Sequence, residues 1–275
     1  MKFGFILPHL LSPISDVTTI RASARLAEEI GFDSIWLTDH ILMPEEYVQY
    51  GKGTEMLVTA AYVAGITQRI GLGLSVLILP MRNPLVAAKQ IASIIHLADR
   101  EFIVGIGVGW NRDEYRFMNA DFERRGKRVD EYIDIMRTLW SEDQPEHEGT
   151  HTFSDVLFAP KPDPLPPIWI GGSSDAALNR AARLGNGYHP NMPTTVADYA
   201  TMIQRIRDMS EGRPVTMSVR ITLDVRGGTA EVIDTLSQLE DVGLEYPVVN
   251  LKHDSLDDLL RSMSRFGRDV IPTFN

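Results

Sequence analysis

The 275-residue chain contains no cysteine, which excludes a disulfide scaffold, a thiolate nucleophile, a zinc ribbon and a cysteine-ligated iron–sulfur cluster. Basic residues are also scarce, since 27 Lys and Arg stand against 37 Asp and Glu, for a net charge of -10 at pH 7. This acidic balance argues against nucleic-acid binding, which usually needs a basic patch. A chain of this length that is 44% hydrophobic can bury a large core without such staples.

Long hydrophobic runs are missing too. No stretch reaches roughly 18 consecutive apolar residues, so we expect no membrane-spanning helix. The apolar run Phe3–Leu7 resembles a signal peptide only superficially, because it is short, is followed by Pro8 and His9, and lacks a small-residue cleavage site. We interpret it as a first strand and expect a cytoplasmic protein.

Short apolar runs alternate along the chain with longer segments of helical spacing. The expected strands are 2–8, 34–39, 70–79, 102–108, 168–171, 187–189, 215–223 and 246–251. The expected helices are 16–30, 54–68, 84–97, 125–140, 174–184, 196–209, 229–242 and 255–266. Apolar strands that are each followed by a helix predict a parallel sheet covered by helices.

Eight strand–helix units in one chain fit a single (β/α)8 barrel, whereas the alternative, an open doubly wound sheet, usually has five to seven strands. We therefore expect one α/β barrel domain over residues 1–275. The acidic and proline-rich segment 141–167 interrupts the rhythm after the fourth helix. It predicts a surface insertion, with a hairpin and then an extended lead-in to the fifth strand.

Active-site residues of a (β/α)8 barrel lie at the carboxyl ends of its strands. Three of the seven histidines fall at such ends: His9, His40 and His189. The Asp39-His40 pair is the sharpest candidate, because histidine can transfer a proton near neutral pH and a carboxylate can orient it or a ligand. The alternative is a loop-capping aspartate beside a surface histidine.

Two glycine-rich segments also follow expected strands. Gly171-Gly172-Ser173-Ser174 opens a helix, where free backbone N–H groups and the helix dipole form an anion site. Gly105, Gly107 and Gly109 alternate along a strand, which leaves one face bare and lets a flat ring lie against the backbone. The alternatives are a tight strand-to-helix turn and tight barrel packing. Trp110 occupies the place of the third glycine of a dinucleotide fingerprint, so that motif is absent.

The segment His147–His151 matches the zinc motif H-E-x-x-H literally. The motif requires both histidines on one face of a helix. Pro145 and the internal Gly149 argue against a helix here, so we expect no metal site.

Eight short segments together carry a family resemblance. They are Lys2–Gly4, Ala27–Trp36, Thr38–His40, Arg69–Gly73, Leu79–Pro84, Gly105–Trp110, Pro166–Gly172 and Gly185–Pro190. In this order, over nearly the whole chain, they resemble the luciferase-like flavin- and deazaflavin-dependent oxidoreductases. The likeness is strongest to the branch that is predicted to use coenzyme F-420.

This resemblance implies a TIM-like barrel, often dimeric, with a flavin or deazaflavin ring over its mouth. It implies that Asp39 and His40 lie near the ring, with His40 close to the hydride-accepting centre. It also implies a bulge with a non-proline cis peptide at Ser75-Val76, behind the ring. The residues expected to bind the cofactor are His9, Ser75, Val76, Gly107, Gly109, Trp110, Asn111, Gly171, Gly172, Ser173, Ser174 and His189.

Three functions remain open. The first is hydride transfer between coenzyme F-420 and a small apolar substrate, with His40 polarising or protonating the substrate and Asp39 positioning the cofactor or the histidine. The second is an FMN-dependent monooxygenase that uses oxygen. The third is a non-catalytic flavin- or deazaflavin-binding protein, suggested by short loops such as Ala98–Glu101, where the family usually has Leu-Ser-Gly-Gly-Arg. The expected partners are a small-molecule substrate and a second copy of the chain, with no nucleic acid and no membrane.

Overall fold

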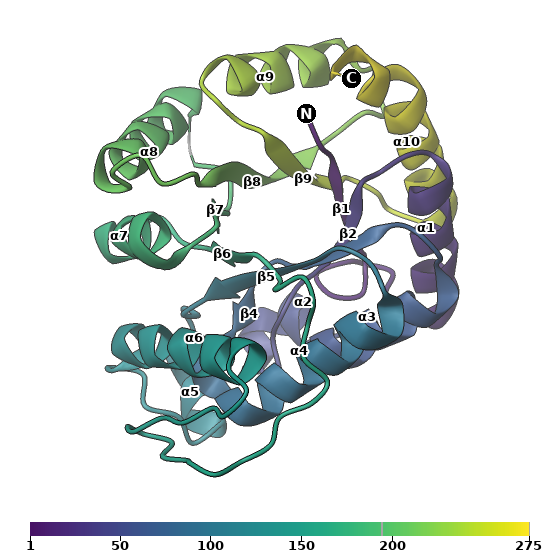
Figure 1. Cartoon of the computed structure of the whole chain (residues 1–275). Helices are drawn as coiled ribbons and strands as arrows, with labels where there is room; N and C mark the ends of the chain where they lie inside the picture. The colour runs from purple at the N-terminus through teal and green to yellow at the C-terminus, as the bar shows by residue number, and fades with distance from the viewer. Residues whose placement is uncertain (194, 275) are drawn as a thin grey trace.

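Parallel strands close a barrel in the computed structural model, which describes residues 1–193 and 195–274 (Figure 1). The strand segments are β1 (Gly4–Ile6), β2 (Ser34–Leu37), β3 (Gly71–Leu74), β4 (Leu77–Ile78), β5 (Phe102–Gly107), β6 (Ile168–Ile170), β7 (Gly187–Tyr188), β8 (Thr216–Leu223) and β9 (Tyr246–Leu251). Their order is β3-β2-β1-β9-β8-β7-β6-β5-β4, and β3 also pairs with β5. Because β3 and β4 are two parts of one strand that both border β5, the barrel has eight positions, and the predicted (β/α)8 barrel is confirmed.

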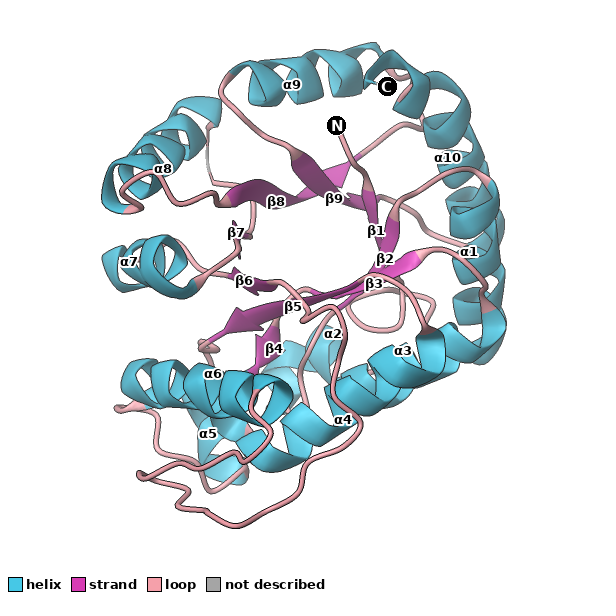
Figure 2. Cartoon of the chain, in the orientation of Figure 1, coloured by secondary structure: helices cyan, strands magenta, loops and turns pink. Residues whose placement is uncertain are grey.

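Helices form the outer ring of the molecule (Figure 2). The longer ones are α1 (Val17–Glu29), α3 (Met56–Ile66), α4 (Pro84–Ala98), α6 (Arg125–Ser141), α7 (Asp175–Leu184), α8 (Val196–Met209), α9 (Ala230–Asp241) and α10 (Leu256–Asp269). Each lies within a few residues of an expected helix. Local sequence sets several ends: the Asp16 carboxylate accepts from Thr18 N and Thr19 N at the start of α1, and Gly31 follows its end with φ +92°.

Two segments that we expected to be loops contain short helices. The first holds a 3-10 turn (Glu45–Tyr47) and α2 (Val48–Gly51), and the second holds α5 (Arg112–Phe117). The expected surface insertion follows α6, where an antiparallel bridge between His147 and Phe153 forms the predicted hairpin. The segment that matched the zinc motif is therefore not helical, and no cluster of metal-ligating side chains occurs in the described residues.

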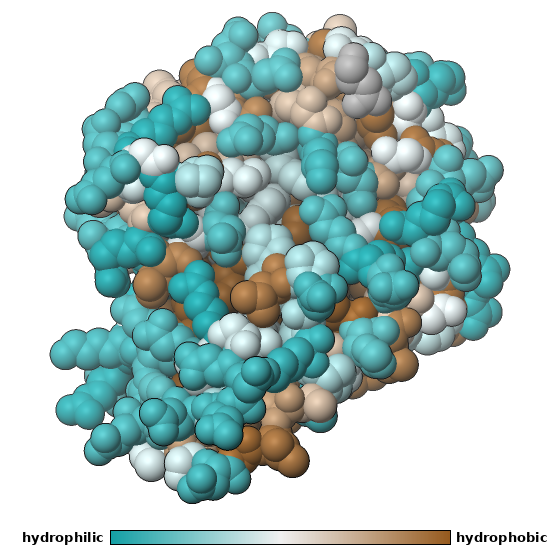
Figure 3. Space-filling model, in the orientation of Figure 1, coloured by the Kyte–Doolittle hydropathy of each residue, from teal (hydrophilic) through white to brown (hydrophobic). Residues whose placement is uncertain are grey.

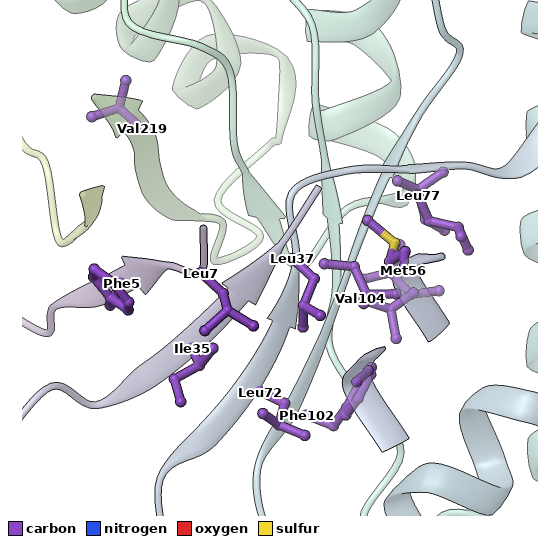
Figure 4. Close-up of a cluster of buried hydrophobic side chains, with 14 of the residues drawn as sticks. Phe5, Leu7, Ile35, Leu37, Met56, Leu72, Leu77, Phe102, Val104 and Val219 are labelled. Atoms are coloured by element: carbon purple, nitrogen blue, oxygen red, sulfur yellow. The ribbon is translucent and has the colours of Figure 1, made fainter. Parts of the chain in front are cut away.

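Outward-facing strand residues form the main core between barrel and helices. Side chains alternate along each strand, so Phe5, Ile35, Leu37 and Val104 point to the helices while their neighbours point into the barrel. Figure 4 shows part of this core. The core fixes the strands from outside and leaves their inner faces for the site.

Aromatic side chains fill the part of the barrel interior that lies toward the amino ends of the strands. The Trp36 and Trp169 rings lie 5.2 Å apart between centroids, and Tyr246 packs edge-on against both. These large rings fit because Gly73 and Gly187 face them, where a Cβ would collide with indole atoms. This aromatic layer closes the barrel at the amino ends of its strands.

Two buried histidines lie above that layer. The backbone N–H of Thr38 donates to His9 Nε2 (2.9 Å), so Nδ1 carries the proton and donates to the Thr54 carbonyl (3.2 Å). His189 stacks on Trp36, with 4.8 Å between ring centroids. Burial lowers the pKa of His9 to about 4 and that of His189 to about 3, so both rings are neutral at pH 7.

The end of the barrel that faces the viewer in Figure 3 carries mainly hydrophilic side chains. This is the amino end of the strands, because α2 and α5, which follow carboxyl ends, lie at the back in Figure 2. Within residues 1–193 and 195–274, no helix combines the length and apolar composition that a bilayer crossing requires.

Replacing Gly187 tests the aromatic layer. A Cβ there would lie 2.5 Å from Trp169 Cδ1, so Gly187→Ala should lower the free energy of unfolding by about 1–3 kcal/mol in urea titrations. The control is Gly65→Ala on α3, where a Cβ meets nothing within 4 Å and should stabilise by at most about 1 kcal/mol. Unchanged stability of Gly187→Ala would contradict this packing.

Acid should destabilise the barrel through the buried histidines. Between pH 6.5 and about 4 the unfolded chain binds a proton at position 9 that the folded chain does not, so stability falls as the pH is lowered through this range. A shift of this size is worth about 3 kcal/mol. His9→Gln should flatten the dependence of the unfolding free energy on pH over this interval, whereas His96→Gln, at an exposed site on α4, should not. Equal slopes in both variants would refute the assignment.

Candidate functional site

A cavity of about 490 Å³ opens at the carboxyl ends of the barrel strands. Ten of the expected site residues line it: Asp39, His40, Ser75, Val76, Gly107, Gly109, Trp110, Gly171, Gly172 and His189. A cavity therefore lies where the rule for (β/α)8 barrels predicts the site. The other four expected residues, His9, Asn111, Ser173 and Ser174, do not line it.

A bulge between β3 and β4 forms the floor of the cavity. Gly73 pairs with Ile103 and Leu77 with Ile106, so four residue steps on one strand face three on the other. The peptide bond between Ser75 and Val76 is cis, as the resemblance implies. The extra residue separates the strand into two parts and turns the backbone toward the cavity.

Several strands hold the bulge by hydrogen bonds. Ser75 N donates to the Leu37 carbonyl of β2 (2.6 Å), and Arg220 Nη1 on β8 donates to the Ser75 carbonyl (3.1 Å). Ser75 Oγ and Ser218 Oγ each bond one nitrogen of His189 at 2.8 Å. His189 therefore links the bulge to β8 and has no free nitrogen for a ligand.

Glycines of β5 and the segment after β6 make room for the bulge. A Cβ on Gly107 would lie 2.5 Å from Val76 Cγ2, and one on Gly171 would lie 2.9 Å from Val76 Cγ1. A Cβ on Gly105 would collide with the Leu74 carbonyl. Tight barrel packing, the alternative interpretation, thus accounts for Gly105 and largely for Gly107, since the bulge occupies the face that they leave bare.

Asp39 supports the bulge from the segment that follows β2. One carboxylate oxygen accepts from Ile78 N (2.9 Å), just beyond the bulge, and the other accepts from Arg82 Nη2 (2.6 Å). Arg82 also pairs with Glu55 (2.8 Å). The Asp39 side chain is fully buried and makes no hydrogen bond to His40 among the described residues. The expectation that it positions the histidine is therefore corrected: Asp39 positions the bulge.

Glu114 is the carboxylate that holds His40. Its Oε2 lies 2.8 Å from His40 Nδ1, and its Oε1 accepts from Ile41 N (2.7 Å). Both side chains are nearly buried. With Nδ1 held in this way, Nε2 is the ring nitrogen without a partner among the described residues, so it is free for a substrate.

Sequence reasoning missed Glu114 because α5 is short and polar. The signal was an N-cap pattern, in which Asn111 precedes an acidic residue by three positions. Asn111 Oδ1 accepts from Glu114 N (2.8 Å) and so begins the helix that carries the carboxylate. Asn111, expected to bind cofactor, thus acts on the site through Glu114.

Aromatic rings border the mouth of the cavity near His40. Tyr50 lies edge-on to His40 with 4.8 Å between centroids, and Trp110 lies 5.6 Å from Tyr50. Tyr47 packs on Trp110 at 5.1 Å. Trp110 is 49% exposed and lines the cavity, so its ring lies between the cavity and solvent. Tyr47 and Tyr50 were missed, since they lie on the short helices of an expected loop.

The start of α7 forms the rim near Gly172. Ser174 Oγ caps the helix by accepting from Ala177 N (3.3 Å), and Gly172 takes φ +103° at the turn. Ser173 and Ser174 are exposed outside the cavity. The segment is thus both a tight turn and an accessible helix N-terminus.

Inward-facing residues of β8 were also missed. Ser218, Arg220 and Thr222 alternate with buried apolar residues, and the last two line the cavity. This period-two pattern was a usable signal, because polar residues at alternate positions of a barrel strand must face one side.

Comparisons with known proteins agree with this geometry. The sequence profile described as luciferase-like monooxygenase matches residues 1–259. An uncharacterized protein of Mycobacterium tuberculosis is 28% identical over 282 residues, which cover 94% of this chain and 96% of that protein. An F420-dependent glucose-6-phosphate dehydrogenase of Kineococcus radiotolerans is 33% identical over 166 residues, which cover 59% of this chain and 49% of that enzyme.

The solved structure of an F420-dependent secondary alcohol dehydrogenase, in complex with an F420-acetone adduct, superposes with a TM-score of 0.85. It covers 100% of this chain and 99% of that chain at 15% sequence identity, so it supports the fold alone. The profile match over most of the chain, on a barrel whose third strand is split at Ser75-Val76, shows that this protein belongs to the luciferase-like monooxygenase family.

Proposed function

We propose that this protein transfers a hydride between coenzyme F-420 and a small organic substrate. The observation that carries the proposal is the His40–Glu114 pair at the edge of a cavity whose floor is the Ser75-Val76 bulge. The F420-dependent names of the Kineococcus relative and of the alcohol dehydrogenase structure support this choice of cofactor.

The cavity has polar groups that suit a ring with acceptor and donor edges. Thr38 Oγ1 is buried in its wall without a hydrogen-bond partner, and Arg220 has guanidinium N–H groups without a protein acceptor among the described residues. The bulge and the segment Gly107–Gly109, which line the cavity, would hold the ring. The N-terminus of α7, beyond Gly171 and Gly172, would bind a phosphate of the cofactor tail.

The bound cofactor would supply the hydride donor or acceptor. His40 Nε2 would give a proton to the substrate oxygen when the adjacent carbon is reduced, or take one when that carbon is oxidised. Glu114 fixes the ring orientation and the tautomer and stabilises the protonated imidazole, as a buried carboxylate does for a catalytic histidine elsewhere. Tyr50 and Trp110 would exclude water from this step and favour an apolar substrate.

Binding of the two candidate cofactors tests the proposal. Fluorescence titration of the ligand-free protein should give a dissociation constant for coenzyme F-420 at least about tenfold below that for FMN, a difference of about 1.4 kcal/mol. Hydride transfer should then be seen with alcohols, aldehydes or ketones as substrates. Binding of neither cofactor would defeat the proposal.

Two other outcomes would point to the alternatives. Preferential binding of FMN, with oxygen consumed in step with substrate, would make the protein a monooxygenase. Tight binding without turnover of any alcohol or carbonyl substrate would make it a binding protein.

Removing the proton-transfer group should affect turnover far more than cofactor binding. We expect His40→Ala to lower kcat by about 10²–10⁴-fold, the usual contribution of general acid–base catalysis. Glu114→Gln should also lower kcat, with little change in KM. The matched control is Glu123→Gln, whose carboxylate forms an exposed ion pair with Arg112. Equal losses of turnover and cofactor affinity in His40→Ala would remove the catalytic role.

A further inference from the structure

Arg220 places a guanidinium at the floor of the cavity, beside the bulge. It lies on β8, and its Nη1 reaches the Ser75 carbonyl at the bulge (3.1 Å). In the strand order, β8 lies four positions from β3, on the opposite side of an eight-position barrel. The side chain therefore crosses the barrel interior above the aromatic layer, and its end borders the space where a ligand would lie.

In the part of the chain that the structure describes, no carboxylate pairs with this cation. Among the described residues, no ion pair involves Arg220, and the hydrogen bond to Ser75 is the one that its side chain makes. The two acidic groups of the site have other partners: Asp39 is paired with Arg82 and Glu114 with His40. Burial lowers the pKa of Arg220 only to about 10, so the guanidinium stays charged at neutral pH.

The remaining N–H groups of Arg220 are open to the cavity. They have no acceptor among residues 1–193 and 195–274, yet they are not among the buried polar atoms that lack a partner, so the cavity gives them access to water. A ligand that fills the cavity removes that water. If it offered no acceptor, it would leave a buried charge unpaired, which is one of the most costly arrangements in a protein.

We propose that Arg220 is the anion-binding residue of this cavity and binds a planar, delocalised anion. The guanidinium fork matches two acceptor atoms in one plane. Two ligands have this chemistry: a carboxylate on the substrate, and the ionised pyrimidine edge of a flavin-type ring. The second source rests on the proposed function, and the first does not. Thr222 and Asn250, which bond each other at 3.3 Å, make the adjoining wall polar.

Small aromatic ligands test the first source on the cofactor-free protein. Calorimetric titration should show benzoate binding at least tenfold more tightly than benzamide, which has the same shape without the charge. Arg220→Gln should abolish the preference, and Arg220→Lys should keep part of it, because a charge remains without the fork. The control is Arg268→Gln, which removes an exposed arginine paired with Asp269. Its preference should equal that of the original protein.

The ionisation of a bound ring tests the second source. The absorbance of bound coenzyme F-420 or of bound reduced FMN, followed against pH, gives the pKa of the ring. Arg220 should favour the ionised ring, so Arg220→Gln should raise that pKa by one unit or more. A preference for benzoate that persists with saturating coenzyme F-420 bound assigns the anion to the substrate. A preference that the cofactor abolishes, together with a shift in the pKa of the ring, assigns it to the cofactor.

The absence of any Arg220-dependent effect in both titrations would overturn the proposal. Failure of both cofactors to bind would overturn the proposed function and leave the benzoate titration to decide on Arg220. Loss of folding is separated from loss of binding by the melting temperature of each variant without ligand. Arg220→Gln should melt no lower than Gly187→Ala, because it removes an unpaired buried charge.

Discussion

The bulge at Ser75-Val76 is the constraint on which the rest of the site depends. Hydrogen bonds reach it from β2, β8 and the segment after β7, and glycines of β5 and of the segment after β6 leave the space that Val76 fills. An irregular backbone segment inside a barrel has polar groups that must be satisfied. The neighbouring strands satisfy them here, so they share one fixed geometry at the cavity floor.

This constraint explains why so many residues that looked functional have structural partners. Asp39 and His40 are adjacent in the sequence, but their side chains reach different elements: Asp39 binds Ile78 and Arg82, and His40 binds Glu114. Each carboxylate therefore has its own task. Asp39 fixes the floor, and Glu114 orients His40.

The fold could be predicted from the sequence because it depends on short-range patterns. Apolar strands followed by amphipathic segments gave eight units, and helix ends such as Asp16 and Gly31 follow local rules. The split of the third strand was not visible in that pattern, since its cause is a match between Val76 and glycines on other strands. Only the family resemblance indicated it.

The site was predictable in position and less so in detail. The carboxyl ends of the strands indicated the right side of the barrel, but α2 and α5 are too short for a periodic signal to identify them. The sequence analysis therefore did not identify Glu114, Tyr47 and Tyr50, which lie on these short helical segments. Arg220 was missed for a different reason, because β8 was identified by its apolar residues and the polar residues between them were not assigned to the barrel interior.

The charge at the cavity floor has a consequence for the buried histidines. Arg220 lowers the pKa of both His9 and His189, in addition to the larger effect of burial. The two rings therefore stay neutral and serve as hydrogen-bonding links, His9 between Thr38 and Thr54 and His189 between the bulge and β8. Because these links carry no charge, Arg220 and the Asp39–Arg82 pair supply the charges at the floor. In the proposed reaction His40 transfers the proton, because its partner Glu114 can balance a positive charge on the imidazole.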